Sequence, residues 1–266
     1  MVALPSMVVC KSQIGSTIND HTKREGGAMP SILITGANRG LGFGLTKLYV
    51  ADGWRVFACC RDPDNAAELS ALSEGCDGSL TFHRLDVEDH ASIDALAASL
   101  KGEPIDVLLN VAGYYGKIIV TEPGGFQKFG TSDYSEWDKT MRVNVYGPMK
   151  MAEALIENVL ASDQKKLVTL SSIIGSIGGN NQGGIYPYRA SKAAVNAIIK
   201  SMAVDFKEKG VTVIPMHPGW VRTDMGGPAA DIDADTSTAG MKKVIDGLTL
   251  ADTGKYMVYD GSELPW

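Results

Sequence analysis

Tyr188 and Lys192 are the side chains of this chain best placed to move a proton. They stand four residues apart, on one face of a predicted helix whose first turn suits Pro187. An ammonium roughly 5 Å from a phenol stabilises the phenolate by on the order of 3 kcal/mol, so we expect the pKa of Tyr188 to fall toward neutrality. Ser172, just after the apolar run at residues 167–170, could hold a substrate oxygen beside Tyr188.

Two other tyrosines are rivals for this role. Tyr146 and Lys150 also form a Tyr-x-x-x-Lys pair, but no serine-bearing strand precedes them and Pro148 lies between them. Tyr186 has Ala190, and no lysine, four residues on. We therefore interpret the Tyr146 pair as accidental.

Length and composition indicate a globular α/β protein. The 266 residues are enough for one large domain or two small ones, and 44% apolar and 21% charged residues are ordinary. The formal net charge of −6 argues against a nucleic-acid surface. The apolar runs are too short for a transmembrane helix, so no membrane partner is expected.

The four cysteines, Cys10, Cys59, Cys60 and Cys76, offer no metal-ligand spacing, and no histidine cluster accompanies them. We interpret them as reduced thiols without a catalytic part and expect no metal. This is compatible with a cytoplasmic protein. Residues 1–29 lack periodicity and make a poor signal or transit peptide, so we expect a flexible N-terminal extension before a single dinucleotide-binding catalytic domain at residues 30–266.

Strand and helix signals alternate along the domain. The expected strands cover residues 31–35, 54–60, 79–85, 105–111, 166–170, 211–216 and 256–259. The expected helices run from the glycine turn to about residue 52, from about 64, from about 90, from about 134 to 161, and over 188–209 before Gly210. This alternation predicts a Rossmann-type doubly wound sheet of seven mostly parallel strands, with helices on both faces.

The residues that could do chemistry follow the ends of these strands. The strand ends carry Gly36, Arg61, Asp86, Asn110 to Gly113, Ser172, and His217 to Gly219. Ligands of such sheets bind outside the carboxyl ends of the strands, so we expect these residues on one edge. The turn from Thr35 to Gly42 lies between a strand and a helix, where glycines let the backbone approach a pyrophosphate at the helix N-terminus.

Over residues 30–266 the chain resembles the short-chain dehydrogenase/reductase family. The motifs are Thr-Gly-x-x-x-Gly-x-Gly at Thr35 to Gly42, Asn-x-Ala-Gly at Asn110 to Gly113, Asn144, Ser172, Tyr188-x-x-x-Lys192 and Pro218-Gly219. Within the family, the segments at residues 175–177, 188–192, 217–225 and 260–266 resemble the Sniffer-type carbonyl reductases and their C-factor relatives.

The resemblance implies roles for individual residues. Tyr188 would protonate a carbonyl oxygen as hydride arrives from a nicotinamide, Ser172 would position that oxygen, Lys192 would hold the nicotinamide ribose and lower the Tyr188 pKa, and Asn144 would support a proton-relay water. The implied cofactor-binding residues are Gly36, Asn38, Arg39, Gly40, Leu41, Gly42, Arg61, Asp86, Val87, Asn110, Ala112, Gly113, Tyr188, Lys192, Pro218, Gly219, Val221 and Thr223.

Several of these assignments have alternatives. Asp86 could be a helix cap, and Val221 and Thr223 could be plain loop residues. His217 is better explained as a satisfied core histidine than as a catalyst. The 16 residues from Ser172 to Tyr188 exceed the spacing in many members, which implies an enlarged loop and leaves Ser171 open as the catalytic serine. We prefer Ser172 because Gly175 follows it in a Ser-x-x-Gly pattern.

The cofactor is predicted to be NADP(H). Arg39 in the glycine turn and Arg61 after the second strand stand where cations would bind a 2′-phosphate. Asp62 could instead bind the ribose hydroxyl of NAD, but Asp62-Pro63 is better explained as a helix N-cap followed by a first-turn proline.

We therefore predict an NADPH-dependent oxidoreductase that reduces a ketone, aldehyde or quinone. An apolar or aromatic substrate fits the segments expected to wall the pocket, which contain Tyr114, Tyr115, Phe126, Phe129, Tyr186 and Trp220. The alternative is a nucleotide-binding regulatory or signalling protein of the same fold with incidental turnover. Self-association through the long helix at 134–161 is compatible with either hypothesis.

Overall fold

The computed structural model describes residues 29–117 and 128–266. The predicted flexible extension lies outside the described residues except for Met29, and the predicted pocket residue Phe126 lies outside them as well.

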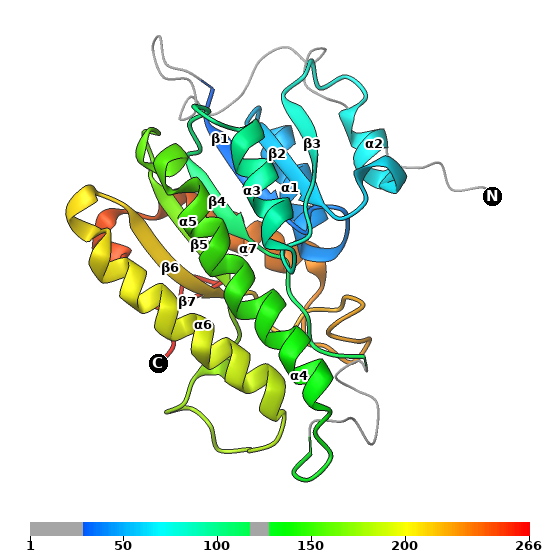
Figure 1. The fold of residues 1–266 in the computed structure, drawn as a ribbon, viewed down its shortest axis with the longest axis vertical. Helices are drawn as coiled ribbons and strands as arrows, with labels where there is room; N and C mark the ends of the chain where they lie inside the picture. The colour runs from blue at the N-terminus through cyan, green and yellow to red at the C-terminus, as the bar shows by residue number, and fades with distance from the viewer. Residues whose placement is uncertain (1–28, 118–127) are drawn as a thin grey trace.

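The described chain is built on a seven-stranded sheet in which all the pairings are parallel (Figure 1). Its order is β3-β2-β1-β4-β5-β6-β7. The strands are β1 (Ser31–Thr35), β2 (Arg55–Cys60), β3 (Leu80–Arg84), β4 (Val107–Asn110), β5 (Lys166–Leu170), β6 (Thr212–His217) and β7 (Met257–Val258). The direction of the chain through the sheet reverses beside β1 and β4, so a cleft is expected at their carboxyl ends.

Helices cover both faces of the sheet (Figure 1). One face packs against α1 (Gly40–Ala51), α2 (Ala67–Ser73) and α7 (Ala234–Gly247). The other packs against α3 (His90–Ser99), α5 (Gly147–Leu160) and α6 (Tyr186–Asp205), while α4 (Tyr134–Met141) precedes α5 and packs on α6. In the described part of the chain, every helix is too short or too polar to span a bilayer.

The two hydrophobic cores follow from the alternation of side chains along each strand. In β1, Ile32 and Ile34 belong to the core under α1 and α7, whereas Leu33 belongs to the core under α3, α5 and α6. All three side chains are fully buried. Since a strand buried on both faces needs apolar residues at every position, these strands appear in the sequence as continuous apolar runs.

The predicted fold class is confirmed, and β1 and β5 have the predicted bounds. The main difference is in the predicted helix at 134–161. It is two α-helices joined by a π-helical stretch at Arg142–Tyr146. Pro148 follows this stretch in the first turn of α5, and a proline cannot continue the regular hydrogen-bond ladder of one long α-helix.

Candidate active site

An open cleft of about 660 Å³ lies at the carboxyl ends of the strands. The cofactor-binding residues predicted from the sequence that line it are Gly36, Asn38, Arg39, Gly40, Leu41, Gly42, Arg61, Asp86, Val87, Ala112, Gly113, Tyr188, Lys192, Pro218 and Thr223. Asn110, Gly219 and Val221 do not line it. The cleft has the size of a typical small-molecule site.

The glycine turn between β1 and α1 forms one wall. Gly36 and Gly40 have positive φ angles of 69° and 53°. A Cβ on Gly42 would lie 2.1 Å from the Gly36 carbonyl oxygen, so only glycine fits there. The N-cap of α1, Arg39, makes no side-chain capping bond, and the first turn holds no acidic residue. The N–H groups of this turn therefore fit a phosphate, as dinucleotide-binding turns do.

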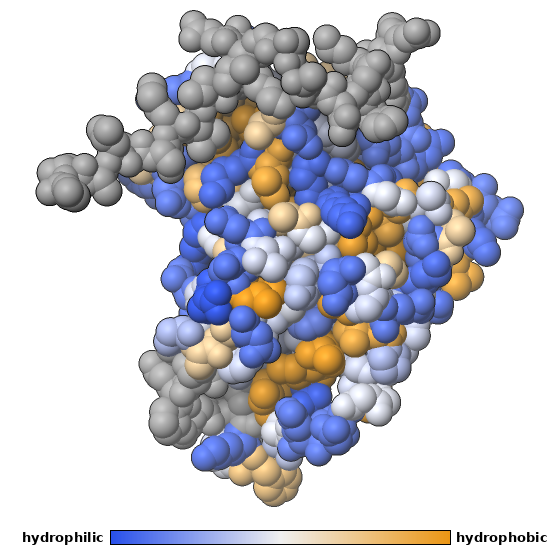
Figure 2. Space-filling model, turned by 180° about the vertical axis from the view of Figure 1, so that it is seen from behind, coloured by the Kyte–Doolittle hydropathy of each residue, from blue (hydrophilic) through white to orange (hydrophobic). Residues whose placement is uncertain are grey.

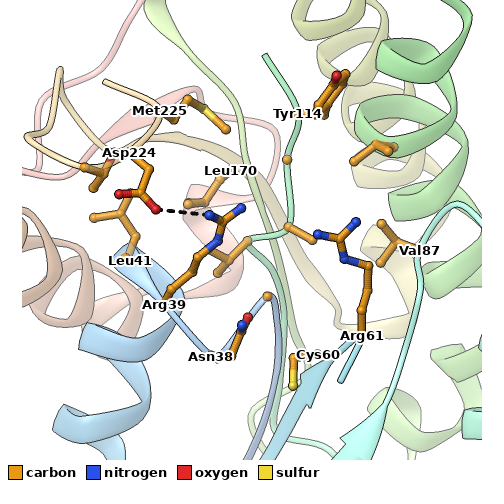
Figure 3. A pocket seen from close by; sticks show the side chains of 18 of the residues that line it. Asn38, Arg39, Leu41, Cys60, Arg61, Val87, Tyr114, Leu170, Asp224 and Met225 are labelled. Atoms are coloured by element: carbon orange, nitrogen blue, oxygen red, sulfur yellow. Dashed lines mark hydrogen bonds and ion pairs between the residues drawn. The ribbon is translucent and has the colours of Figure 1, made fainter. Parts of the chain in front are cut away.

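Two arginines extend along the same side of the cleft (Figure 3). Arg39 Nη1 lies 3.0 Å from Asp224 Oδ2, and both side chains are largely exposed. The Arg61 guanidinium lies beside Val87. Both cations line the cleft.

Asp62 and Asp86 are the two nearby carboxylates for which the sequence suggested a helix-capping role. Asp62 occupies the predicted N-cap position of the short 3-10 helix Pro63–Asn65, but its side chain makes no capping bond to the backbone. It accepts a hydrogen bond from Asn65 Nδ2 at 2.7 Å instead. The alternative for Asp86 is wrong, because the residue that caps α3 is Asp89. Asp86 Oδ1 accepts from the Glu88 N–H and lies in the cleft wall.

The segment after β4 is held by a residue that sequence reasoning missed. Thr35 Oγ1 accepts from the N–H groups of both Val111 and Ala112 at 3.0 Å. Asn110 lies beneath the cleft, where its Nδ2 donates to Thr169 Oγ1. Its buried Oδ1 has no hydrogen-bond partner among the described residues. Thr35 belongs to the predicted glycine motif, but only the parallel pairing of β1 with β4 makes it a support for Ala112.

The segment after β6 provides the opposite wall. Gly219, with φ of 86°, leaves room for Ile232 and Tyr259, because a Cβ there would lie 2.6 Å from Ile232 Cδ1. Val221 is buried and pairs with Ile232, so it shapes the segment from behind. Pro218 and Thr223 reach the cleft itself.

Tyr188 and Lys192 line the cleft, and Ser172 is bonded to Tyr188. Tyr188 lies in the first turn of α6 and is buried, and its side chain is hydrogen-bonded to that of Ser172. Lys192 Nζ lies 5.5 Å from the centre of the Tyr188 ring and donates to the Leu170 carbonyl at 2.8 Å. Ser172 follows β5, so the strand end and the helix start bring the three side chains together.

The predicted fall in the pKa of Tyr188 is wrong for this structure. Burial raises that pKa well above its ordinary value, Tyr256 and Tyr115 add to the rise, and the hydrogen bond with Ser172 only partly opposes it. Burial also lowers the pKa of Lys192 to about 8. Burial disfavours the charged phenolate and is the largest cause of this rise. A raised pKa keeps Tyr188 protonated at neutral pH, which is the form that donates a proton.

The geometry favours Ser172 over Ser171, the choice that the sequence left open. Ser171 is buried, and its hydroxyl donates to Asn196 Oδ1 at 2.6 Å. The Tyr256 hydroxyl oxygen lies 3.2 Å from Ser171 Oγ. Ser171 lines the cleft, but its hydroxyl is engaged by Asn196, whereas Ser172 is bonded to Tyr188.

Asn144 lies in the π-helical stretch and is buried. Its Oδ1 accepts from the Tyr114 N–H, and its Nδ2 donates to the Tyr114 carbonyl and to Ser191 Oγ. The side chain thus ties the segment after β4 to α6.

Of the predicted aromatic residues that the structure describes, only Tyr114 lines the cleft. The Tyr115 ring lies 4.9 Å from that of Tyr188. Tyr114 lines the cleft and donates to Glu136 Oε2 at 2.6 Å. Phe129 and Tyr186 are exposed and contact each other, and Trp220, also partly exposed, donates to the Gly226 carbonyl.

The sequence predicts no catalytic part for three groups of residues: the Tyr146 pair, His217 and the cysteines. Lys150 pairs with Asp94 at 2.6 Å, so the interpretation of the Tyr146 pair as accidental is supported. His217 has its pKa lowered to about 4 by burial. The expectation that it is fully satisfied is wrong, because its buried Nδ1 has no partner among the described residues. Cys59, Cys60 and Cys76 are buried, and Cys60 lines the cleft, whereas Cys10 lies outside the described residues.

Tyr256 and Arg189 are further supports that sequence reasoning missed. Arg189 follows Tyr188 and donates to the carbonyls of Ile174, Gly183 and Gly184, so it holds the enlarged loop from α6. Tyr256 is fully buried and donates to the Ser172 carbonyl. No motif points to Tyr256, although Arg189 lies inside the Tyr188 to Lys192 motif.

Comparison with known proteins gives consistent matches. The model of the short chain dehydrogenase family matches residues 30–233. C-signal of Myxococcus xanthus is 37% identical over 172 residues, which cover 65% of this chain and 99% of that protein. The carbonyl reductase Sniffer of D. melanogaster is 33% identical and superposes with a TM-score of 0.81, covering 90% of this chain and 100% of that one. An NADPH-bound carbonyl reductase from chicken fatty liver is 31% identical with a TM-score of 0.80, covering 90% and 99%.

Proposed function

This chain belongs to the short chain dehydrogenase family, and we propose that it is an NADPH-dependent carbonyl reductase with Tyr188 as the general acid. Membership makes it an oxidoreductase that uses a nicotinamide cofactor. The observation that carries the proposal is the buried Tyr188, bonded to Ser172 and adjacent to Lys192, at the floor of a cleft with a phosphate-binding turn. Both Sniffer and the chicken liver protein are carbonyl reductases, which supports the same assignment.

The residues of the cleft fit a dinucleotide. The glycine turn and the first N–H groups of α1 would hold the pyrophosphate, and Lys192 would hold the nicotinamide ribose. The chemistry that a bound NADPH supplies is a hydride for the carbonyl carbon. Ser172 would orient the carbonyl oxygen, and Tyr188 would give that oxygen its hydroxyl proton. Solvent would then return the proton to Tyr188 past Asn144.

The preference for NADPH is expected to depend on Arg61. The ion pair of Arg39 with Asp224 joins two exposed groups and is worth under about 1 kcal/mol, so a phosphate can compete for Arg39. Arg61→Asp removes one cation and repels the phosphate, which should lower kcat/KM for NADPH by about a hundredfold, while NADH is used as well or better. Initial rates with both cofactors measure the ratio.

Lys101→Asp is the matched control, because it changes the net charge equally at an exposed position outside the cleft. Its cofactor ratio should equal that of the wild type. A wild-type preference for NADH, or an Arg61→Asp variant that keeps its preference for NADPH, would refute the assignment.

Binding of NADPH is expected to weaken above pH 8. Lys192 has its pKa lowered to about 8, so its ammonium is present below that pH and is lost above it. The Kd for NADPH, measured by fluorescence from pH 7 to 9.5, should rise toward about tenfold per pH unit at the alkaline end. This range lies above the second phosphate pKa of about 6, so the charge of the phosphate stays constant.

Lys192→Arg separates the charge of residue 192 from other effects of pH. A guanidinium stays charged throughout this range, so the profile of that variant should be flat even if its affinity is lower. A flat profile in the wild type would show that the Lys192 charge does not hold the cofactor.

Exposed apolar side chains close in sequence to Ser172 and Tyr188, together with Met225 in the cleft wall, support an apolar or aromatic carbonyl substrate. Exposed apolar side chains come from the loop after Ser172, the segment after β6 and the start of α6: Ile173, Ile177, Tyr186, Trp220 and Met225. Figure 2 shows an apolar band across the lower half of the back face, the half in which Figure 1 places the start of α6. Lys139 and Arg222 also line the cleft, so the expectation of an apolar substrate rests on these exposed apolar side chains.

The test is a panel of quinones, aromatic aldehydes and apolar ketones, each with NADPH and with NADH. Oxidation of NADPH by several of them is the expected result.

The similarity to C-signal is the observation that favours the alternative of a nucleotide-binding signalling protein. That alternative gains if NADPH binds and no carbonyl is reduced.

Self-association through the long helical segment stays a prediction. Tyr134 is 77% exposed on α4 and stacks on Trp137 with ring centres 5.8 Å apart, which would suit a second copy.

A further inference from the structure

The chain beyond β7 is an ordered arm. It turns at Gly261, whose φ is 91°, and Ser262 donates to Asp260 Oδ1. Met257 pairs with Glu263 in an antiparallel bridge, and the Leu264 N–H donates to the Tyr256 carbonyl at 2.8 Å. These bonds direct the following residues back beside β7 and α6 (Figure 1).

Trp266, in this arm, contacts the loop that follows the catalytic serine. Its main-chain oxygen accepts from Ser176 Oγ and from the Gly178 N–H, both at 3.1 Å. Its ring lies 5.5 Å from the ring of Tyr256 and under Lys200 Nζ of α6. Trp266 therefore bonds to the loop through its backbone and packs against Tyr256 through its side chain.

Tyr256 continues this connection to the catalytic serine. Its hydroxyl donates to the Ser172 carbonyl and approaches Ser171 Oγ at 3.2 Å. Its side chain is fully buried, so its position is fixed by packing on all sides. The contacts thus run from Trp266 through Tyr256 to Ser172, and in parallel from Trp266 to Ser176.

The loop is held from outside by few groups, among them Asn196, whose Nδ2 donates to the Gly175 carbonyl at 3.4 Å. Between Ser172 and α6 the described chain has one short 3-10 helix, at Ile173–Gly175, and the rest is glycine-rich and mostly exposed. Arg189 holds this loop from the α6 side only. Catalytic groups must be held within about 0.5 Å of their productive positions, and a misplacement of about 1 Å can lower the rate a hundredfold.

We propose that Trp266 and Tyr256 are positioning residues, which hold Ser172 and its loop in the geometry needed for proton transfer from Tyr188. This inference rests on the proposed carbonyl reductase function, since the rate it concerns is that of the reduction. It assigns a part in catalysis to an arm that touches neither the cleft nor the glycine turn.

The experiment compares Tyr256→Phe, Trp266→Ala, Trp266→Phe and Ser176→Ala with the wild type. Leu250→Ala is the control, because Leu250 is 40% exposed, as against 36% for Trp266, and lies on the 3-10 helix Leu250–Asp252 away from the loop. For each variant, kcat is divided by the fraction of protein that binds NADPH, so unfolded protein does not count. Amide hydrogen exchange over residues 172–185 reports the order of the loop without any substrate.

We expect Tyr256→Phe and Trp266→Ala to lower the corrected kcat about tenfold with the Kd for NADPH unchanged. Amide exchange of the loop should be faster in these two variants and in Ser176→Ala. Trp266→Phe should keep most of the kcat that Trp266→Ala loses. Leu250→Ala should match the wild type in both kcat and exchange. A wild-type kcat in Tyr256→Phe and Trp266→Ala, or a loss of their kcat without faster exchange in the loop, would overturn the inference. If the wild type reduces no carbonyl, the proposed function fails, and exchange alone decides whether the arm holds the loop.

Discussion

Tyr188→Phe is expected to abolish most carbonyl reduction while leaving the cofactor site intact. The change removes only the hydroxyl that would protonate the carbonyl oxygen, and general acids of this kind contribute about 100- to 10,000-fold. We expect kcat/KM to fall by about a thousandfold, with the Kd for NADPH within about twofold of the wild type. Steady-state rates and fluorescence titration measure the two quantities.

Tyr146→Phe is the matched control. Tyr146 begins the second Tyr-x-x-x-Lys pair but is 48% exposed, and its lysine is paired with Asp94. The change should leave both the rate and the affinity at wild-type values. Retention of more than about a tenth of the wild-type kcat/KM in Tyr188→Phe would remove this hydroxyl from the mechanism.

Gly42→Ala is expected to raise the Kd for NADPH by at least about a hundredfold. The new Cβ would lie 2.1 Å from the Gly36 carbonyl oxygen and 2.8 Å from its carbon, and both are backbone atoms that cannot rotate away. The turn must therefore open, which we expect to cost about 3 kcal/mol of cofactor binding. Titration with NADPH and thermal unfolding of the same samples test this.

Gly53→Ala, at the other end of α1, distinguishes loss of binding from loss of stability. Gly53 has a positive φ of 75° but no atom within 4 Å of the added Cβ. The substitution should lower stability by about 1 kcal/mol and leave the Kd unchanged. Wild-type binding by a folded Gly42→Ala variant would show that the turn does not hold the cofactor.

The sheet could be predicted closely because its determinants are local. The apolar runs of β1 and β5 end at polar or glycine residues, and the strand-helix alternation leaves one common topology. The break between α4 and α5 was missed, although Pro148 was visible in the sequence. A proline can end, kink or shift a helix, so Pro148 alone does not fix which of these occurs. In the structure it follows a π-helical stretch in which Asn144 bonds to the Tyr114 backbone, a contact between residues 30 positions apart.

The supports of the site could not be predicted because they join residues distant in sequence. Tyr256 reaches Ser172 across 84 positions, and Arg39 reaches Asp224 across 185. The wrong direction for the pKa of Tyr188 has a similar cause. The spacing to Lys192 is visible in the sequence, whereas the burial that raises the pKa of Tyr188 depends on the whole fold.

Transfer of deuterium tests the central claim most directly. NADPH that carries deuterium at the transferable position of the nicotinamide is incubated with the wild type and a carbonyl that it reduces, and the alcohol is analysed by mass spectrometry. We predict an alcohol that carries the deuterium on the former carbonyl carbon, formed by the wild type and by Tyr146→Phe and nearly absent with Tyr188→Phe. An alcohol without deuterium, or equal amounts of labelled alcohol from Tyr188→Phe, would contradict hydride transfer assisted by the Tyr188 proton.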